Sequence, residues 1–299
     1  MPTFSQQFKL PKSAKYEFFD IPLESDFEAF ICPFLIANNR ANSRINQVYL
    51  QIKSFLAKLN RTYIVTSKRK DGLVFLSHLH ELNYFHLGYS EVNKGRAVSN
   101  NRAQLIFDSL SRNKLTVQTN VTITNEAHNV LLLVEGIGQD IMSDIISNVC
   151  LNIFAQFTVD ICNKYNIQTT KSVKIEYFNL KNKNWESKSF NLPYYNNQII
   201  VLVPKLIISG KREYSERYSY FISKNYISKG LLNGSIKSQM INTLVKTNIS
   251  NGQKRAIFKA IHKVYKKPKR ELIEFVLRYN KSLSEFLDYA KLNYPELNL

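Results

Sequence analysis

The stretch GIGQDIMSDIISN (residues 136–148) places two glycines just before an apolar periodicity that is typical of a helix. From Met142 the apolar side chains recur at positions 142, 145, 146, 149, 153, 157 and 161, which predicts a helix reaching about Lys164. Asp140 and Asp144 lie off this apolar stripe. The two aspartates therefore need a separate explanation.

The segments around this helix alternate between helical and strand-like patterns. Asn42–Leu59 carries a helical apolar stripe, and another helix is expected from about Arg102 to Leu110. Residues 114–123 and 199–203 are strand-like, and residues 172–192 predict two strands around the turn KNKN. From about Tyr214 the chain is mostly helical. The sequence predicts a compact α+β fold with a central sheet and a mostly helical C-terminal part.

After Gln168 the residue pattern changes from helical to strand-like, which suggests a domain boundary within the chain. We expect an N-terminal α+β part over residues 1–168, which carries the Gly/Asp motif. Residues 169–299 would then form a strand hairpin followed by a basic helical part. One continuous domain remains the alternative.

The composition indicates a basic protein of the cytoplasm. Lys and Arg number 41 against 23 Asp and Glu, giving a net charge of +18, which favours a nucleic-acid partner, either DNA or RNA. A coding bias toward Lys, Asn and Ile is the competing explanation. No run of 18 apolar residues predicts a membrane span, and the N-terminal residues lack the pattern of a signal peptide. Three cysteines, an odd number, favour reduced thiols.

Asp140 and Asp144 are the first candidates for chemistry. Four residues apart on a helix, they share one face and can chelate a cation such as Mg²⁺ or accept hydrogen bonds from one arginine. A Mg²⁺-dependent nuclease needs clustered carboxylates of this kind. The alternative is structural: Asp140 caps the helix and Asp144 interacts with its dipole.

Two further groups of residues are candidates near this motif. Glu81 and His86 would complete a catalytic set with the aspartates, because an imidazole titrates near neutrality and can act as a general acid or base. A glycine-containing loop before the 102–110 helix carries Lys94, Arg96 and Arg102, which suits a phosphate. No nucleotide-binding motif occurs in the sequence, so ATP hydrolysis is not expected.

Residues 252–275 are the most basic stretch of the chain. Basic side chains flank an apolar helical stripe there, so one face can pack while the other follows a phosphate backbone. A solvated lysine face is the alternative. The residues predicted to bind nucleic acid in this stretch are Lys254, Arg255, Lys259, Lys263, Lys266, Lys267, Lys269 and Arg270.

Four blocks of the sequence resemble an uncharacterised group of bacterial proteins associated with phage-defence loci of the abortive-infection kind. The blocks are DIPLESDFEAFICPFLI (20–36), ELNYFHLGYSEVNKGR (81–96), VEGIGQDIMSD (134–144) and IIVLVPKLI (199–207). The Gly-Ile-Gly-x-Asp pattern of that group is intact, whereas Cys32 stands where the group has an aspartate. The resemblance implies a defence context, with a partner protein from the same locus, and no particular reaction.

Two classes of function follow from these observations. The first is a cytoplasmic anti-phage effector that acts on nucleic acid as a metal-dependent nuclease through Asp140 and Asp144. The second is a non-catalytic nucleic-acid-binding or sensor subunit of a defence complex, in which both acids are structural. A toxin that contacts tRNA or the ribosome is a third alternative.

Overall fold

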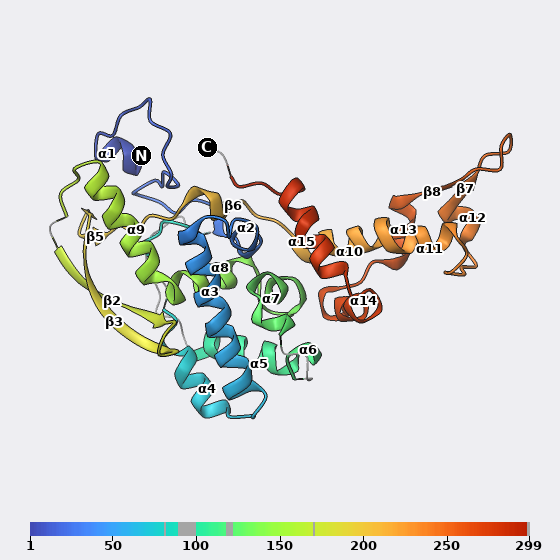
Figure 1. The fold of residues 1–299 in the computed structure, drawn as a ribbon, viewed down its shortest axis with the longest axis horizontal. Helices are drawn as coiled ribbons and strands as arrows, with labels where there is room; N and C mark the ends of the chain where they lie inside the picture. The colour runs from blue at the N-terminus through green and yellow to red at the C-terminus, as the bar shows by residue number, and fades with distance from the viewer. Residues whose placement is uncertain (81, 89–99, 118–121, 170, 298–299) are drawn as a thin grey trace. The chain divides into compact units, whose positions relative to one another are not determined.

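The chain divides into two compact units, seen here in a computed structural model that describes residues 1–80, 82–88, 100–117, 122–169 and 171–297 (Figure 1). Unit 1 comprises residues 1–131, 136–212 and 290–299. Unit 2 comprises residues 132–135 and 213–289. The division falls after Arg212 and not after residue 168, so the strand hairpin that follows residue 170 belongs to unit 1.

Most of the helices belong to unit 1. They are α1 (Phe4–Gln7), α2 (Pro33–Asn38), α3 (Ser43–Lys58) with a π-helical continuation (Leu59–Ile64), α4 (Arg69–Leu76), α5 (Asn100–Arg112), α6 (Lys114–Val117), α7 (Ala127–Leu133), α8 (Gln139–Val149) and α9 (Leu151–Lys164). Helix α7 has residues in both units. Helix α3 begins where the sequence predicts, because the Asn42 side chain accepts hydrogen bonds from the backbone N–H groups of Arg44 (3.0 Å) and Ile45 (3.2 Å).

The described strands pair in four two-stranded antiparallel sheets, which confirms an α+β fold but does not form the expected central sheet. In unit 1, β1 (Phe30–Ile31) pairs with β6 (Ile208–Ser209), β2 (Lys171–Asn179) with β3 (Asn184–Leu192), and β4 (Tyr194–Tyr195) with β5 (Gln198–Ile199). The β2–β3 hairpin confirms the two strands predicted around KNKN, with Lys171 opposite Leu192 and Asn179 opposite Asn184. It packs against α9, as Figure 1 shows.

The helix predicted from Met142 to Lys164 is in fact two helices, α8 and α9, bent by 72° at Cys150. In a continuous helix the Val149 carbonyl would accept a hydrogen bond from the N–H of Ile153, but that N–H bonds the Cys150 carbonyl instead (2.9 Å). The buried side chain of Gln51 in α3 supplies the missing donor, with its Nε2 at 2.7 Å from the Val149 oxygen. The sequence periodicity continues through the bend, so it could not reveal the break.

Two segments predicted as strands have a different structure. Of the strand predicted over 114–123, residues 118–121 lie outside the described residues. Residues 114–117 form the short helix α6, which begins where the Asn113 side chain accepts a hydrogen bond from the Leu115 N–H (3.0 Å). Leu115 and Thr116 are both buried, which differs from the pattern of a strand with one face in solvent.

Residues 199–203 are buried as predicted, but only Ile199 belongs to a strand. The backbone N–H groups of the next two residues donate hydrogen bonds to two different segments of the chain. Ile200 N–H bonds the Pro193 carbonyl (3.0 Å), and Val201 N–H bonds the Tyr84 carbonyl (2.9 Å). This segment therefore joins several parts of the core and does not follow one neighbouring strand.

Unit 2 is mostly helical, as the sequence predicts. Its helices are α10 (Tyr214–Ile222), which continues as a π-helix (Ser223–Ile227), α11 (Ser228–Leu232), α12 (Ile241–Leu244), α13 (Phe258–Tyr265), α14 (Leu272–Arg278) and α15 (Ser282–Asn293), of which α15 ends in unit 1. Strands β7 (Val245–Thr247) and β8 (Lys254–Ala256) form a hairpin. A small aromatic core holds the unit: Tyr218 is fully buried, its hydroxyl lies 2.6 Å from that of Ser282, and its ring packs against Phe286.

No single helix in the described part of the chain is long and apolar enough to cross a membrane. Helices α8 and α9 reach that length and composition only together, across their 72° bend. Most of their side chains are buried in the protein.

The hydrogen bond across the bend leads to a first prediction. Gln51→Leu keeps a similar size but leaves the Val149 carbonyl without its donor, so the free energy of unfolding should fall by about 1–3 kcal/mol. Urea unfolding followed by circular dichroism measures the change. Gln156→Leu, on the exposed face of α9, is the control and should change it by less than about 0.5 kcal/mol. Equal effects of the two substitutions would contradict the role of Gln51.

The three cysteines lead to a second prediction. Cys32, Cys150 and Cys162 are buried and form no disulfide, and burial raises the pKa of Cys162 to about 12 and that of Cys150 further. Because the thiolate is the reactive form, a maleimide should label none of the three rapidly in the native protein and all three in denaturant. Mass spectrometry of the two samples counts the labels, and a rapidly labelled native thiol would contradict the buried assignment.

Candidate functional site

Of the two glycines of the GIGQDIMSDIISN motif, Gly136 is required by the backbone before α8, whereas Gly138 has an ordinary φ of −88°. Gly136 has φ +84°, and a Cβ atom there would lie 2.6 Å from the hydroxyl oxygen of Ser109 in α5. Gly138 is the N-cap residue, and a Cβ atom at this position would lie 2.6 Å from the Asp140 carboxylate. Both glycines therefore allow the chain to enter α8 in close contact with its neighbours.

The two aspartates have different environments. The N-cap is Gly138, so the expectation that Asp140 caps the helix is wrong; Asp140 lies in the first turn, where the helix dipole favours a negative charge. Asp144 forms an ion pair with Arg102 of α5, with 2.6 Å between Oδ2 and Nη1. Both side chains are partly exposed, at 29% for Arg102 and 39% for Asp144. The sequence left open whether Asp144 binds a cation or an arginine, and in the structure it binds Arg102.

The uncharged polar residues of α8 bind backbone groups from distant parts of unit 1. Ser143 Oγ accepts a hydrogen bond from the N–H of Ile31 in β1 (3.0 Å). Asn148 bonds both backbone groups of His80, accepting from its N–H (2.8 Å) and donating to its carbonyl (2.7 Å). The bond to Ile31 is buried, so it satisfies a backbone group that would otherwise destabilise the fold, and the two bonds to His80 are partly buried.

Gln139 makes the corresponding contacts at the start of α8. Its Nε2 donates to the hydroxyl of Ser209 (2.8 Å) and to the carbonyl of Gly210 (3.1 Å). Its Oε1 accepts from the N–H of Arg212 (2.9 Å). Together with Ser143 and Asn148, Gln139 makes α8 a helix that fixes three neighbouring segments of chain.

The other residues predicted for a catalytic set are only partly within the described residues. Glu81 lies outside them. His86 is buried, and burial lowers its pKa, partly opposed by a hydrogen bond with the backbone of Ser25. Its own carbonyl accepts from the N–H of Phe27 (2.9 Å). His86 is thus a neutral side chain held by the 25–27 segment.

A second histidine group follows α4 and contacts side chains of the β2–β3 hairpin. His78 Nδ1 is 3.0 Å from one carboxylate oxygen of Glu176, and His80 Nε2 is 3.8 Å from the other. The His78 ring stacks on Trp185 with 5.2 Å between the centroids. Among the described residues, no group of three or more His, Cys, Asp or Glu side chains is placed to hold a metal ion.

The basic loop before α5 can be followed only in part. Lys94 and Arg96 lie outside the described residues. Arg102, the third residue predicted to bind phosphate there, is the partner of Asp144. The first turn of α5 therefore contributes a guanidinium that is already paired with a carboxylate.

Most of the basic residues of unit 2 lie in a stretch without acids. Residues 217–270 contain thirteen Lys and Arg residues and no Asp or Glu. Lysines and arginines beyond the predicted set also lie here, and each is exposed: Arg217, Lys224, Lys229, Lys237 and Lys246. A count of acids along the sequence would have revealed this longer basic segment.

Five of the eight basic residues predicted from the sequence are exposed and form no ion pair with any residue that the structure describes. They are Lys254 and Arg255 on β8, Lys259 and Lys263 on α13, and Lys266 at its C-cap. On α13, Lys259, Lys263 and Lys266 are spaced i, i+4 and i+7, which places them along one face. Ile261 on the same helix is fully buried, so the helix has a packed face and a basic face.

The remaining three predicted residues follow α13 and are less available. Lys267 pairs with Glu274 (2.9 Å) and Glu271 (3.4 Å), and these carboxylates raise its pKa. The guanidinium of Arg270 lies 3.6 Å from Glu271. Lys269 is partly buried. The unpaired basic surface therefore ends at Lys266.

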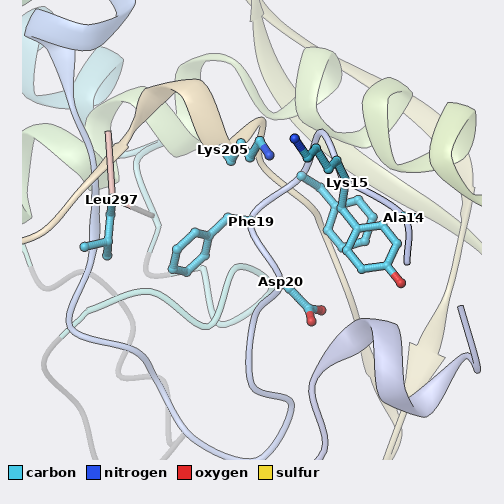
Figure 2. Close-up of a pocket in the computed structure, with 8 residues that line it drawn as sticks. Ala14, Lys15, Phe19, Asp20, Lys205 and Leu297 are labelled. Atoms are coloured by element: carbon cyan, nitrogen blue, oxygen red, sulfur yellow. The ribbon is translucent and has the colours of Figure 1, made fainter. Parts of the chain in front are cut away.

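Unit 1 has a pocket that none of the predicted residues lines. Figure 2 shows this pocket, whose volume is about 270 Å³. It is lined by Ala14, Lys15, Tyr16, Phe18, Phe19, Asp20, Lys205 and Leu297. The Asp20 carboxylate accepts hydrogen bonds from the N–H (2.8 Å) and the hydroxyl (2.6 Å) of Ser5, while the ends of Lys15 and Lys205 point toward each other. The carboxylate is thus fixed by Ser5, and the two ammonium groups make one end of the pocket positive.

The Arg102–Asp144 pair leads to a third prediction. Because both side chains are partly exposed, Asp144→Asn and Arg102→Gln should each lower the free energy of unfolding by at most about 1 kcal/mol, with a coupling of about 0.2–1 kcal/mol in the double variant. Urea unfolding measures all three variants. Asp140→Asn combined with Arg102→Gln is the control cycle and should be additive. A coupling near zero between Asp144→Asn and Arg102→Gln would contradict the pairing of these two side chains.

Comparison with known proteins places the chain in a family. A model of a family described as a domain of unknown function (DUF8370) matches residues 9–215, which is more than half of the chain. No curated protein and no solved structure matches the chain. The family match covers most of unit 1 and ends three residues into the 213–289 segment of unit 2. The chain therefore belongs to the DUF8370 family, through its residues 9–215.

Proposed function

We propose that this protein is a cytoplasmic nucleic-acid-binding protein of a phage-defence system, and that unit 2 contacts the phosphates. The observation that supports this proposal is the acid-free stretch over residues 217–270, with its exposed and unpaired basic residues on β8 and α13. Such a surface attracts a polyanion because each phosphate that it neutralises releases condensed counterions.

Helix α13 is the part of this surface best suited to a phosphate backbone. Lys259, Lys263 and Lys266 share one face, and the opposite face is anchored in unit 2 by Ile261. Lysines carried by a folded helix lose less backbone freedom on binding than lysines of a disordered tail would lose. The net charge of +18 adds attraction at longer range.

The contacts around α8 support a protein that binds nucleic acid without cleaving it. Hydrolysis by a Mg²⁺-dependent nuclease needs clustered carboxylates that remain available to the ion. Here the charge of Asp144 is balanced by Arg102 at 2.6 Å, and the uncharged polar residues of α8 bond backbone groups of unit 1. The motif thus has a structural use that does not require a metal at Asp140 and Asp144.

The defence context rests on the resemblance of four sequence blocks to proteins associated with phage-defence loci. Three of the blocks lie wholly within unit 1, and the block VEGIGQDIMSD lies in it from Gly136 onward. We include in the proposal a partner protein encoded in the same locus, for which unit 1 would be the contact and unit 2 the nucleic-acid-binding part.

The proposal predicts a salt-dependent affinity that depends on α13. Replacing Lys259, Lys263 and Lys266 with Gln should weaken binding to a labelled nucleic acid. The slope of log K against log salt should fall by about 0.9 for each phosphate of a duplex that these lysines no longer neutralise. Lys267 is left in place because Glu271 and Glu274 already balance its charge. Fluorescence anisotropy over a range of salt concentrations measures both quantities, and phage plating on cells measures protection.

The control removes the same charge from unit 1. Lys68, Lys70 and Lys181 are exposed, and their replacement with Gln should leave affinity and slope nearly unchanged. If both triple variants lose the same affinity, the effect depends only on net charge and not on α13. If the wild-type protein does not bind nucleic acid at low salt, the proposal is wrong. Incubation of the complex with Mg²⁺ or EDTA should leave the nucleic acid intact. Cleavage that EDTA stops would favour the nuclease alternative.

A further inference from the structure

The β7–β8 hairpin is the most basic strand pair of the described chain, and its packing fixes which side chains face outward. Val245 and Ala256 are directly opposite each other and buried, so this face of the hairpin packs within unit 2. Lys246 and Arg255 form the next pair and are exposed. Because successive side chains point to opposite faces of a strand, these two charges lie on the solvent face.

The pair Lys246 and Arg255 places two positive charges at a position where they repel. Directly opposite residues in an antiparallel pair have Cβ atoms about 4.5–5.5 Å apart, and like-charged side chains in this arrangement destabilise the hairpin. No Asp or Glu occurs between residues 217 and 270 to balance them locally. An anion bound between the two side chains reduces this repulsion, because its negative charge attracts both positive charges.

The loop at the tip is ordered by its own side chains. Asn248 Oδ1 accepts hydrogen bonds from the N–H (3.0 Å) and the hydroxyl (2.7 Å) of Ser250, and Asn251 Oδ1 accepts from the N–H of Gln253 (3.0 Å). Between them Ile249 is fully exposed, and Figure 1 shows the loop projecting from the helices α11, α12 and α13. A single exposed isoleucine is ordinary on a surface, but this one lies at the tip of a basic hairpin.

We propose that this hairpin enters the major groove of double-stranded DNA, with Lys246 and Arg255 at the phosphates and Ile249 against the base edges. This inference rests on the proposed function and names its ligand. The major groove of B-DNA, about 12 Å wide, admits a two-stranded β-ribbon, and its thymine methyl groups offer an apolar contact to Ile249. Lys259 and Lys263 follow directly on α13 and extend the contact along the phosphate backbone.

The composition of the hairpin disfavours other polyanions. The major groove of A-form RNA is too deep and narrow for side chains to read. Binding to single strands relies on aromatic side chains that stack on bases, and residues 245–256 contain none. Anchoring to an anionic membrane surface needs an extended apolar face, whereas the solvent side of this hairpin has the one isoleucine.

The test compares one labelled sequence as duplex DNA, duplex RNA and single-stranded DNA, with the full-length protein and anisotropy as the readout. The wild-type protein should bind duplex DNA the most tightly. Lys246→Gln with Arg255→Gln should weaken that binding about tenfold and lower the salt slope by about 2, whereas Ile249→Ser should weaken it with the slope unchanged. Lys181→Gln with Lys183→Gln, in the turn of the β2–β3 hairpin, is the control with the same loss of charge and should change little.

The outcomes separate this inference from the proposed function. If the α13 variant loses affinity while the hairpin variants do not, unit 2 binds nucleic acid and the hairpin inference is wrong. Duplex RNA or single strands bound as tightly as duplex DNA also overturn it, as does hairpin-dependent binding to phosphatidylserine vesicles with no preference for DNA. Circular dichroism and thermal midpoints of the variants confirm that each is folded. Absence of binding to all three nucleic acids would instead contradict the proposed function itself.

Discussion

The arrangement of unit 1 depends on a hydrogen bond to the carbonyl oxygen of Val149 from a donor outside its own helix. Helices α8 and α9 carry one continuous apolar stripe, yet they point in directions 72° apart. The bend is possible because Gln51 Nε2 bonds that oxygen at 2.7 Å and also bonds Asn152 Oδ1 at 2.8 Å, at the start of the next helix. As a result α8 lies against β1, and α9 lies against the β2–β3 hairpin.

The same helix shows why a motif of polar residues is difficult to interpret from sequence. Gly136 and Gly138 allow a close approach, Gln139, Ser143 and Asn148 bond distant backbone groups, and Asp144 balances Arg102. Each of these residue types is also common in catalytic sites. Their use in unit 1 becomes visible only when the partner is known, and the partner of Ser143 is 112 residues away in the sequence.

Elements that are determined by interactions between residues close in the sequence were predicted correctly, and elements that are determined by distant residues were not. Helix α3 and the β2–β3 hairpin were predicted because a local cap and a regular alternation specify them. The break at Cys150 and the irregular path after Ile199 were missed because bonds with Gln51, Pro193 and Tyr84 determine them. Likewise, the exposed lysines of α13 were identifiable from charge and spacing alone. The pairing of Asp144 with Arg102 was not, since nothing in either segment points to the other.

The junction at Arg212 has a consequence for the length of chain that unit 1 can accommodate. Arg212 donates hydrogen bonds to the carbonyls of Tyr294 (3.1 Å) and Pro295 (2.6 Å), so unit 1 holds together the point where the chain leaves and the point where it returns. For unit 1, residues 213–289 are then a closed loop, and doubling the length of such a loop costs only about 0.6 kcal/mol. A longer or shorter chain between Arg212 and Tyr294 therefore costs unit 1 little loop entropy. Changes of chain length between these two residues are thus compatible with the fold of unit 1.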